Sequence, residues 1–149
     1  MVDIDTITAL LTALGQYLDE LEQYRHLSYD EFVATTKHYW AVEHGLRMAI
    51  QALLDVGSHI LAAETEHPVE EYRDIIVALG KEGILPPAFA GRILGMAGFR
   101  NILVHRYRQV NLREVYDHLQ SDLDDFRLFA RYVTEWLAKK GYLVLTSAD

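Results

Sequence analysis

The chain has 149 residues, of which half are hydrophobic and 24% are charged, a composition typical of a globular protein that buries a core. We therefore expect a single domain over residues 1–149. The absence of cysteine excludes disulfides, thiolate metal sites and thiol catalysis. The acidic start is unlike a targeting signal, and no apolar run approaches the roughly 20 residues of a membrane span. We expect a cytoplasmic protein without a membrane partner, and the net charge of −8 argues against a general nucleic-acid coat.

Three segments carry apolar residues at alternating spacings of three and four, the pattern of a helix that packs in a bundle. Their stripes are Ile4, Ile7, Leu11, Leu14, Leu18 and Leu21; Tyr39, Val42, Leu46, Ala49, Leu53, Val56 and Ile60; and Leu112, Val115, Leu119, Leu123, Phe126, Ala130, Val133 and Leu137. No segment alternates with period two between turn signals. The sequence therefore predicts an all-α, antiparallel bundle of four or five helices. Because the stripes also suit a contact between two copies, we expect a homodimer that uses one of them; the alternative is that every stripe is internal core.

Turn and capping residues predict the remaining elements. A helix is expected over residues 69–79, and another over residues 86–106, where two prolines suit the first helical turn. Gly95 and Gly98 mark expected kinks or close approaches in that helix. A capping box at Asn111 predicts a last helix that begins directly after it.

Residues 83–113 contain no Asp or Glu but five arginines, at positions 92, 100, 106, 108 and 113. This stretch carries +5, while the rest of the chain carries −13. It includes the run Arg100-Asn101-Ile102-Leu103-Val104-His105-Arg106-Tyr107, an R-N-x3-H-x-Y motif. A cationic segment with a histidine on an acidic protein predicts a phosphate-handling site, and any RNA contact is expected here.

The motif residues do not all share one helical face. Asn101, His105 and Arg108 fall within about 40° of one another on an ideal helix, and Arg100 lies close to Tyr107 on a neighbouring face. Arg100 and His105 are about 140° apart, so a straight helix does not aim both at one atom. Either the helix tightens or ends near His105, or a symmetry-related copy completes the site.

The chemistry that these groups permit is narrow. Arginine pairs with phosphate through a rigid fork, and histidine exchanges a proton near neutral pH. His105 can take the proton of a ribose 2′-hydroxyl or give one to the leaving 5′-oxygen, while Arg100 stabilises the charge on phosphorus. Tyr107 would position phosphate or be modified. The alternative is that these residues have only structural roles. In that case Arg100 caps a helix or bridges neighbouring groups, His105 ends a helix and Tyr107 is half-buried.

The stretch from Met96 to Tyr107 resembles the signature of the HepT family of HEPN-domain proteins. The preceding Leu79-Gly80-Lys81-Glu82-Gly83-Ile84-Leu85 resembles that family as well. Residues 41–60, AVEHGLRMAIQALLDVGSHI, are similar to its long central helix. The likeness covers roughly residues 37–110.

This resemblance implies a homodimeric HEPN-like bundle that is a metal-independent endoribonuclease, the toxin of a type VII-like toxin–antitoxin pair. It implies RNA as the substrate and a minimal nucleotidyltransferase antitoxin, MntA-like, as the partner. Arg100 and His105 match the catalytic pair of the family, and Tyr107 matches the tyrosine that the antitoxin adenylylates. Asn101 belongs to the same polar patch, and we expect Arg106 and Arg108 to help it bind RNA.

Other function classes stay open at this stage. One is a non-catalytic helical module that binds a nucleotidyltransferase partner or nucleic acid, and another is a subunit that presents a ligand to such a transferase. No histidines have the spacing of a metal site and no phosphate-binding loop is present, so no metal or other cofactor is predicted.

Two further groups of charged residues are expected to have structural roles only. Asp122, Asp124 and Asp125 are expected to form a solvated acidic face. Glu43 and Arg47, four residues apart, are expected to form a surface ion pair.

Overall fold

The computed structural model describes residues 1–66 and 69–144. They form α1 (Ile4–Arg25), α2 (Tyr29–Ala34), α3 (Thr36–Glu64), α4 (Tyr72–Lys81), α5 (Pro87–Ile93), α6 (Gly95–His105), the 3-10 helix η1 (Tyr107–Gln109), α7 (Leu112–Ser121) and α8 (Leu123–Lys139). No strand occurs among these residues. The all-α bundle predicted from the sequence is confirmed.

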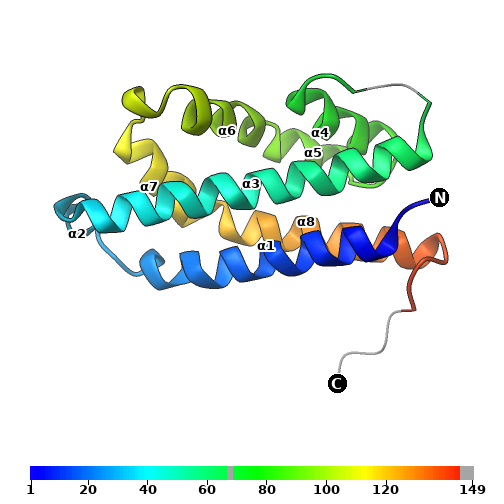
Figure 1. The fold of residues 1–149 in the computed structure, drawn as a ribbon, viewed down its shortest axis with the longest axis horizontal. Helices are drawn as coiled ribbons and strands as arrows, with labels where there is room; N and C mark the ends of the chain where they lie inside the picture. The colour runs from blue at the N-terminus through cyan, green and yellow to red at the C-terminus, as the bar shows by residue number, and fades with distance from the viewer. Residues whose placement is uncertain (67–68, 145–149) are drawn as a thin grey trace.

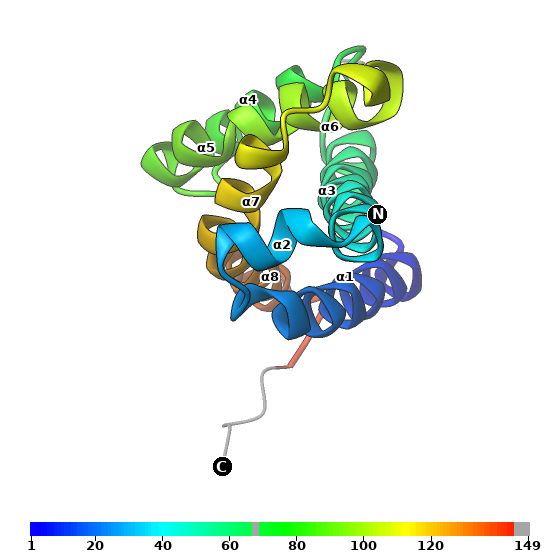
Figure 2. The same cartoon turned by 90° about the vertical axis from the view of Figure 1, so that its left-hand side faces the viewer.

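The helix α3 is the centre of the bundle. It lies antiparallel to α1, and α8 runs back along α1 (Figure 1). On the other side of α3, α4, α5 and α6 form a second group of helices, and α7 leads from this group to α8 (Figure 2). The chain segment with the R-N-x3-H-x-Y motif therefore packs against the middle of the molecule at α6.

The apolar stripes build the core. The α3 residues Val42, Leu46, Ala49, Leu53, Val56 and Ile60 are all 0% exposed. By length and composition α3 resembles a membrane span, but its apolar face is buried in the bundle. The stripes are thus used inside one chain, as the alternative interpretation held, and a contact with a second copy would need other surfaces.

Two predicted helices are divided in the structure. The helix predicted to begin after Asn111 is divided at Asp122 into α7 and α8. The Asp122 carboxylate accepts hydrogen bonds from His118 (2.6 Å) and Ser121 (3.2 Å). The helix expected over residues 86–106 is divided at Leu94, next to the expected kink at Gly95. At Gly98 nothing lies within 4 Å of an added Cβ, so the expected close approach is not found there.

The short helix α2 was not predicted from apolar spacing. Its signal is a capping box at Ser28: the Ser28 hydroxyl accepts from the Glu31 amide, and the Glu31 carboxylate accepts from the Ser28 amide. Phe32 anchors this helix in the core. Six residues are too few for a stripe to be visible in the sequence.

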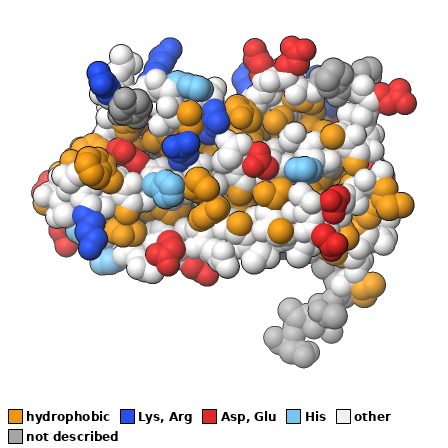
Figure 3. Space-filling model, viewed as in Figure 1, with side chains coloured by type: hydrophobic (Ala, Val, Ile, Leu, Met, Phe, Trp, Pro, Cys, Tyr) orange, Lys and Arg blue, Asp and Glu red, His pale blue; other side chains and the backbone are white. Residues whose placement is uncertain are grey.

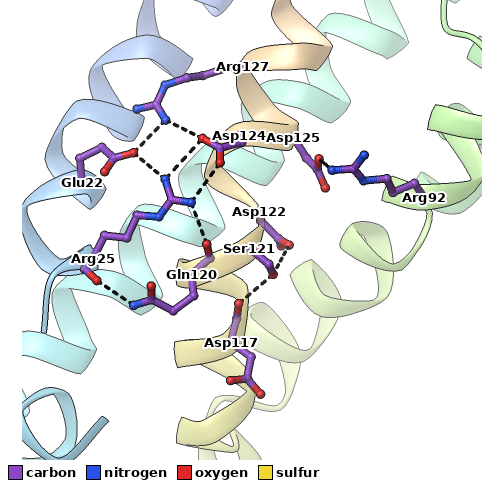
Figure 4. A network of polar contacts seen from close by, with 10 residues as sticks. All are labelled: Glu22, Arg25, Arg92, Asp117, Gln120, Ser121, Asp122, Asp124, Asp125 and Arg127. Atoms are coloured by element: carbon purple, nitrogen blue, oxygen red, sulfur yellow. Dashed lines mark hydrogen bonds and ion pairs between the residues drawn. The ribbon is translucent and has the colours of Figure 1, made fainter. Parts of the chain in front are cut away.

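The prediction of a solvated acidic face is wrong for Asp122 and Asp125, which are 9% and 7% exposed. Asp125 pairs with Arg92 of α5, and Asp124 pairs with Arg25 of α1 at 3.1 Å (Figure 4). Burial raises the pKa of Asp125, although the Arg92 charge opposes this effect. Cations from other helices thus compensate the aspartates, and the cluster joins α8 to α1 and α5.

Gly57 sets the distance between α3 and α4. A Cβ at this position would lie 2.7 Å from Cγ2 of Ile75 and 2.9 Å from Cδ1 of Leu79. These separations are shorter than van der Waals contact, so an alanine would push α4 outward or force side chains from their rotamers.

We predict that Gly57→Ala lowers the free energy of unfolding by about 1–3 kcal/mol, the usual cost of overpacking a core. The matched control is Gly15→Ala in α1, where nothing lies within 4 Å of the added Cβ. Helix propensity alone should then raise stability by up to about 1 kcal/mol. Urea denaturation measures both; equal stabilisation by the two alanines would contradict the close approach at Gly57.

Candidate active site

The motif lies where α6 ends. α6 stays α-helical to His105, and Arg106 then leaves the helix with φ −124° and ψ 35°. The Arg106 amide donates to the Ile102 carbonyl at 2.9 Å, and η1 follows directly. The expected end of the helix near His105 is therefore confirmed. Tyr107 begins η1 with its backbone, and its side chain lies outside the described part of the structure.

Arg100 is fixed by groups from three helices. Its Nε donates to Gln51 Oε1 of α3 at 2.9 Å, and its Nη1 donates to Asn101 Oδ1 at 3.1 Å. The guanidinium carbon lies 4.4 Å from the ring centroid of Tyr72, the first residue of α4. Behind this contact, Gln51 Nε2 donates to Asp55 Oδ1 at 2.8 Å.

The apolar stripes gave no indication of these partners. Gln51 and Asp55 are polar positions within the otherwise apolar middle of α3, and Gln51 interrupts the run Ala49-Ile50-Gln51-Ala52-Leu53-Leu54. Such an interruption is the one sequence signal that points to a polar contact on a core helix. Tyr72 carries no comparable signal, because its position depends on how α4 packs on α3.

His105 differs from Arg100 in its surroundings. Its side chain is exposed at the end of α6. Among the contacts between described side chains, none joins His105 to Arg100. The structure thus keeps both motif residues on one short helix but does not bring them together within one chain, in agreement with the angular separation expected from the sequence.

Residues 83–113, which contain no Asp or Glu, supply fewer cations to the site than their sequence suggests. Arg92 pairs with Asp125, and Arg113 pairs with Asp117 at 3.3 Å and lies over Tyr29. These two arginines are thus engaged in contacts away from the motif. The exposed side chains of Arg106 and Arg108 remain with the motif at the end of α6 and in η1.

Figure 3 shows the face that bears α3 and α6. Lys, Arg and His side chains gather over α6 and the adjoining half of α3, while acidic side chains lie over α1 and the opposite end. Near α6 a cavity of about 180 Å³ is lined by Trp40, Glu43, His44, Arg47 and Leu103.

Among the ion pairs of the described residues none joins Glu43 to Arg47, so the expected surface pair is not formed. Burial raises the pKa of Glu43.

His118 of α7 packs against α6, the helix that carries the motif. The His118 ring stacks on Phe99, the neighbour of Arg100, with 3.9 Å between ring centroids. Burial disfavours the charged ring, but the hydrogen bond to Asp122 and the carboxylates of Glu114 and Asp117 outweigh it, so the pKa of His118 is raised. His118 thus links α7 to the helix that carries the motif.

The family model described as Ribonuclease HepT-like matches residues 14–133, which is most of the chain. The chain belongs to the HepT-like ribonuclease family. This membership favours an enzyme over the two non-catalytic classes that the sequence left open.

Two relatives of this chain are nucleases of different RNAs. The tRNA nuclease HepT of Aphanizomenon flos-aquae (strain 2012/KM1/D3) is 28% identical over 131 residues, covering 88% of this chain and 89% of that protein. The mRNA nuclease HepT of Shewanella oneidensis is 29% identical over 84 residues, covering 56% of this chain and 63% of that protein.

A solved structure has the same fold. The tri-AMPylated HEPN toxin of Shewanella oneidensis in complex with its MNT antitoxin superposes with a TM-score of 0.79 at 22% identity, covering 91% of this chain and 99% of that chain. At this identity the likeness establishes the HEPN fold of the HepT-like chain.

No group of three or more His, Asp or Glu side chains able to hold a metal ion occurs within residues 1–66 and 69–144.

Because the folded-state pKa of His118 is raised, its protonation stabilises the fold at low pH. The contribution is present in full below the ordinary histidine pKa of about 6.5 and is lost as pH rises through the folded-state value. We predict that His118→Gln costs the most free energy of unfolding near pH 5.5 and progressively less toward pH 8.5, roughly the range in which a raised histidine pKa titrates. The control is His59→Gln, an exposed histidine of α3. Denaturation at several pH values measures the difference, and a pH-independent cost would contradict the prediction.

Proposed function

We propose that this protein is a metal-independent endoribonuclease and the toxin of a toxin–antitoxin pair. The observation that carries the proposal is the arrangement at the end of α6 in a member of a ribonuclease family. Arg100 is held in place without an ion pair among the described residues, and an exposed His105 follows five residues later. An oriented cation and an accessible imidazole are the groups that phosphodiester cleavage without a metal requires.

In this mechanism His105 takes the proton of the ribose 2′-hydroxyl, and the 2′-oxygen attacks phosphorus. The bond from phosphorus to the 5′-oxygen breaks, and the leaving oxygen receives a proton from water. The products are a 2′,3′-cyclic phosphate and a 5′-hydroxyl. Arg100 donates hydrogen bonds to the phosphate oxygens as negative charge develops on them. Asn101, Arg106 and Arg108 bind the RNA backbone on either side of the scissile bond.

We predict that His105→Ala and Arg100→Ala each lose at least about 100-fold in cleavage rate, the usual range for a proton-transfer group or a charge-stabilising donor. Cleavage of RNA by the wild type should continue in EDTA. Arg131→Ala is the matched control, because Arg131 pairs with Glu135 on the surface of α8. Fluorescent RNA substrates measure the rates, and circular dichroism checks the fold. Full activity of either motif variant, or abolition by EDTA, would contradict the mechanism.

We further propose that the protein acts as a homodimer in which the two motif segments face a common groove. Within one chain Arg100 and His105 are not in contact, so a second copy that faces the first would complete the groove. We predict a dimer in sedimentation at micromolar concentration. A clean 17 kDa monomer would contradict it, and a dimer with its motifs on opposite outer faces would contradict the shared groove alone.

The proposed partner is a minimal nucleotidyltransferase antitoxin, and the proposed location is the cytoplasm, where cellular RNA is available. The comparison with the AMPylated Shewanella toxin in complex with its antitoxin supports this partner.

The modified residue in this chain would be Tyr107. An AMP on its hydroxyl adds a bulky base and a negative phosphodiester two residues from His105, so RNA is excluded and positive charge is neutralised.

We predict that Tyr107→Phe cleaves RNA but is not silenced by the nucleotidyltransferase partner with ATP, because the ring is kept while the hydroxyl is absent. Wild-type protein treated in the same way should gain the mass of AMP and lose both RNA binding and cleavage. Intact-mass spectrometry and a cleavage assay measure the two effects. If the partner silences Tyr107→Phe as fully as the wild type, it inhibits by covering the groove instead.

A further inference from the structure

The surroundings of Arg100 differ from those of the arginines that hold the fold. Arg25, Arg92 and Arg127 each pair with a carboxylate. Among the described residues, the contacts of Arg100 are neutral: the amides of Gln51 and Asn101 and the ring of Tyr72. Its position is thus fixed while its charge stays available. A structural arginine needs no such arrangement, whereas an arginine that binds a phosphate in the transition state does.

We propose that Gln51 and Tyr72 are positioning residues that hold Arg100 in the orientation in which it receives the scissile phosphate. This inference rests on the proposed ribonuclease function. Neither residue belongs to the motif, and neither is proposed to touch the reacting atoms.

The hydrogen-bond pattern determines how Gln51 is oriented. An ionised carboxylate only accepts hydrogen bonds, so Asp55 must face the NH₂ group of Gln51, 2.8 Å away. The carbonyl oxygen of Gln51 is then directed at Nε of Arg100. Asp55 therefore acts on Arg100 through a neutral amide, which transmits orientation without placing a negative charge on the guanidinium.

The same contacts select which donors of Arg100 remain for phosphate. A guanidinium carries five N–H donors, and Gln51 and Asn101 engage two of them. The remaining donors are both hydrogens of Nη2 and one of Nη1, which form the end of the fork. Tyr72 covers one face of the guanidinium and limits its rotation. Phosphate is thus expected to approach end-on, with the fork already aligned.

The first test changes Gln51 in two ways. Gln51→Leu removes the acceptor, and we expect kcat to fall about 10- to 100-fold, as misplacement of a catalytic group by about 1 Å does, with little change in KM. Gln51→Glu, combined with Asp55→Asn so that an amide still donates to residue 51, keeps an acceptor for Arg100 but pairs it with a charge. For this variant we expect an equal or larger loss of kcat with an unchanged melting temperature. A merely structural role predicts the opposite for this variant, namely retained activity. Gln23→Leu, at an exposed position of α1, is the control for added surface hydrophobicity.

The second test asks whether the effects act through Arg100. Combined with Arg100→Ala, Gln51→Leu should cause no further loss, because there is no guanidinium left to position. Tyr72→Phe should retain activity, since the ring face is kept, and Tyr72→Leu should lose it. Wild-type rates from Gln51→Leu, or additive losses in the double variant, would overturn the positioning role while leaving the ribonuclease intact. A wild type that cleaves no RNA would overturn both proposals.

Discussion

The packing of α6 against α3 is the constraint on which the site depends. It brings Arg100 within hydrogen-bond distance of Gln51, the polar residue that interrupts the apolar middle of α3. Gln51 and Asp55 are half-buried, and the hydrogen bonds from Gln51 to Asp55 and from Arg100 to Gln51 orient the guanidinium. The fold thus holds this cation in position through neutral contacts, and a cation held in position is the condition for electrostatic stabilisation of a transition state.

The remaining polar groups fall into two sets. Some form ion pairs or hydrogen bonds within the bundle, and others are exposed at the end of α6. Arg25, Arg92 and Arg127 compensate acidic residues where α1, α5 and α8 meet. His118 and Asp122 join α7 to the base of α6. Removal of these pairs would loosen the supports of the motif helix, so their effect on activity would follow from changed stability. The side chains of His105, Arg106 and Arg108 are exposed at the end of α6 and in η1.

The sequence predicted the features that follow from local periodicity and from resemblance. The buried faces of α1 and α3, the helix end near His105 and the all-α fold were all predicted, because apolar spacing and caps are local signals. The division at Leu94 lies next to the predicted kink at Gly95, whereas the division at Asp122 was missed, since the apolar stripe continues through it. The burial of Asp125 and the environment of Arg100 were missed for another reason. Both depend on partners far away in the chain, Arg92 and Gln51, that no spacing rule connects.

The central claim is that the end of α6 cleaves RNA by attack of the 2′-hydroxyl. The most direct measurement uses an RNA with one mapped cleavage site and the same RNA with a single 2′-deoxy nucleotide at that site, both incubated with the protein in EDTA. The account predicts that the deoxy substitution abolishes cleavage at that bond, while the unmodified RNA yields 2′,3′-cyclic phosphate ends by mass spectrometry. Cleavage at the deoxy position, or products with a free 3′-hydroxyl, would contradict it.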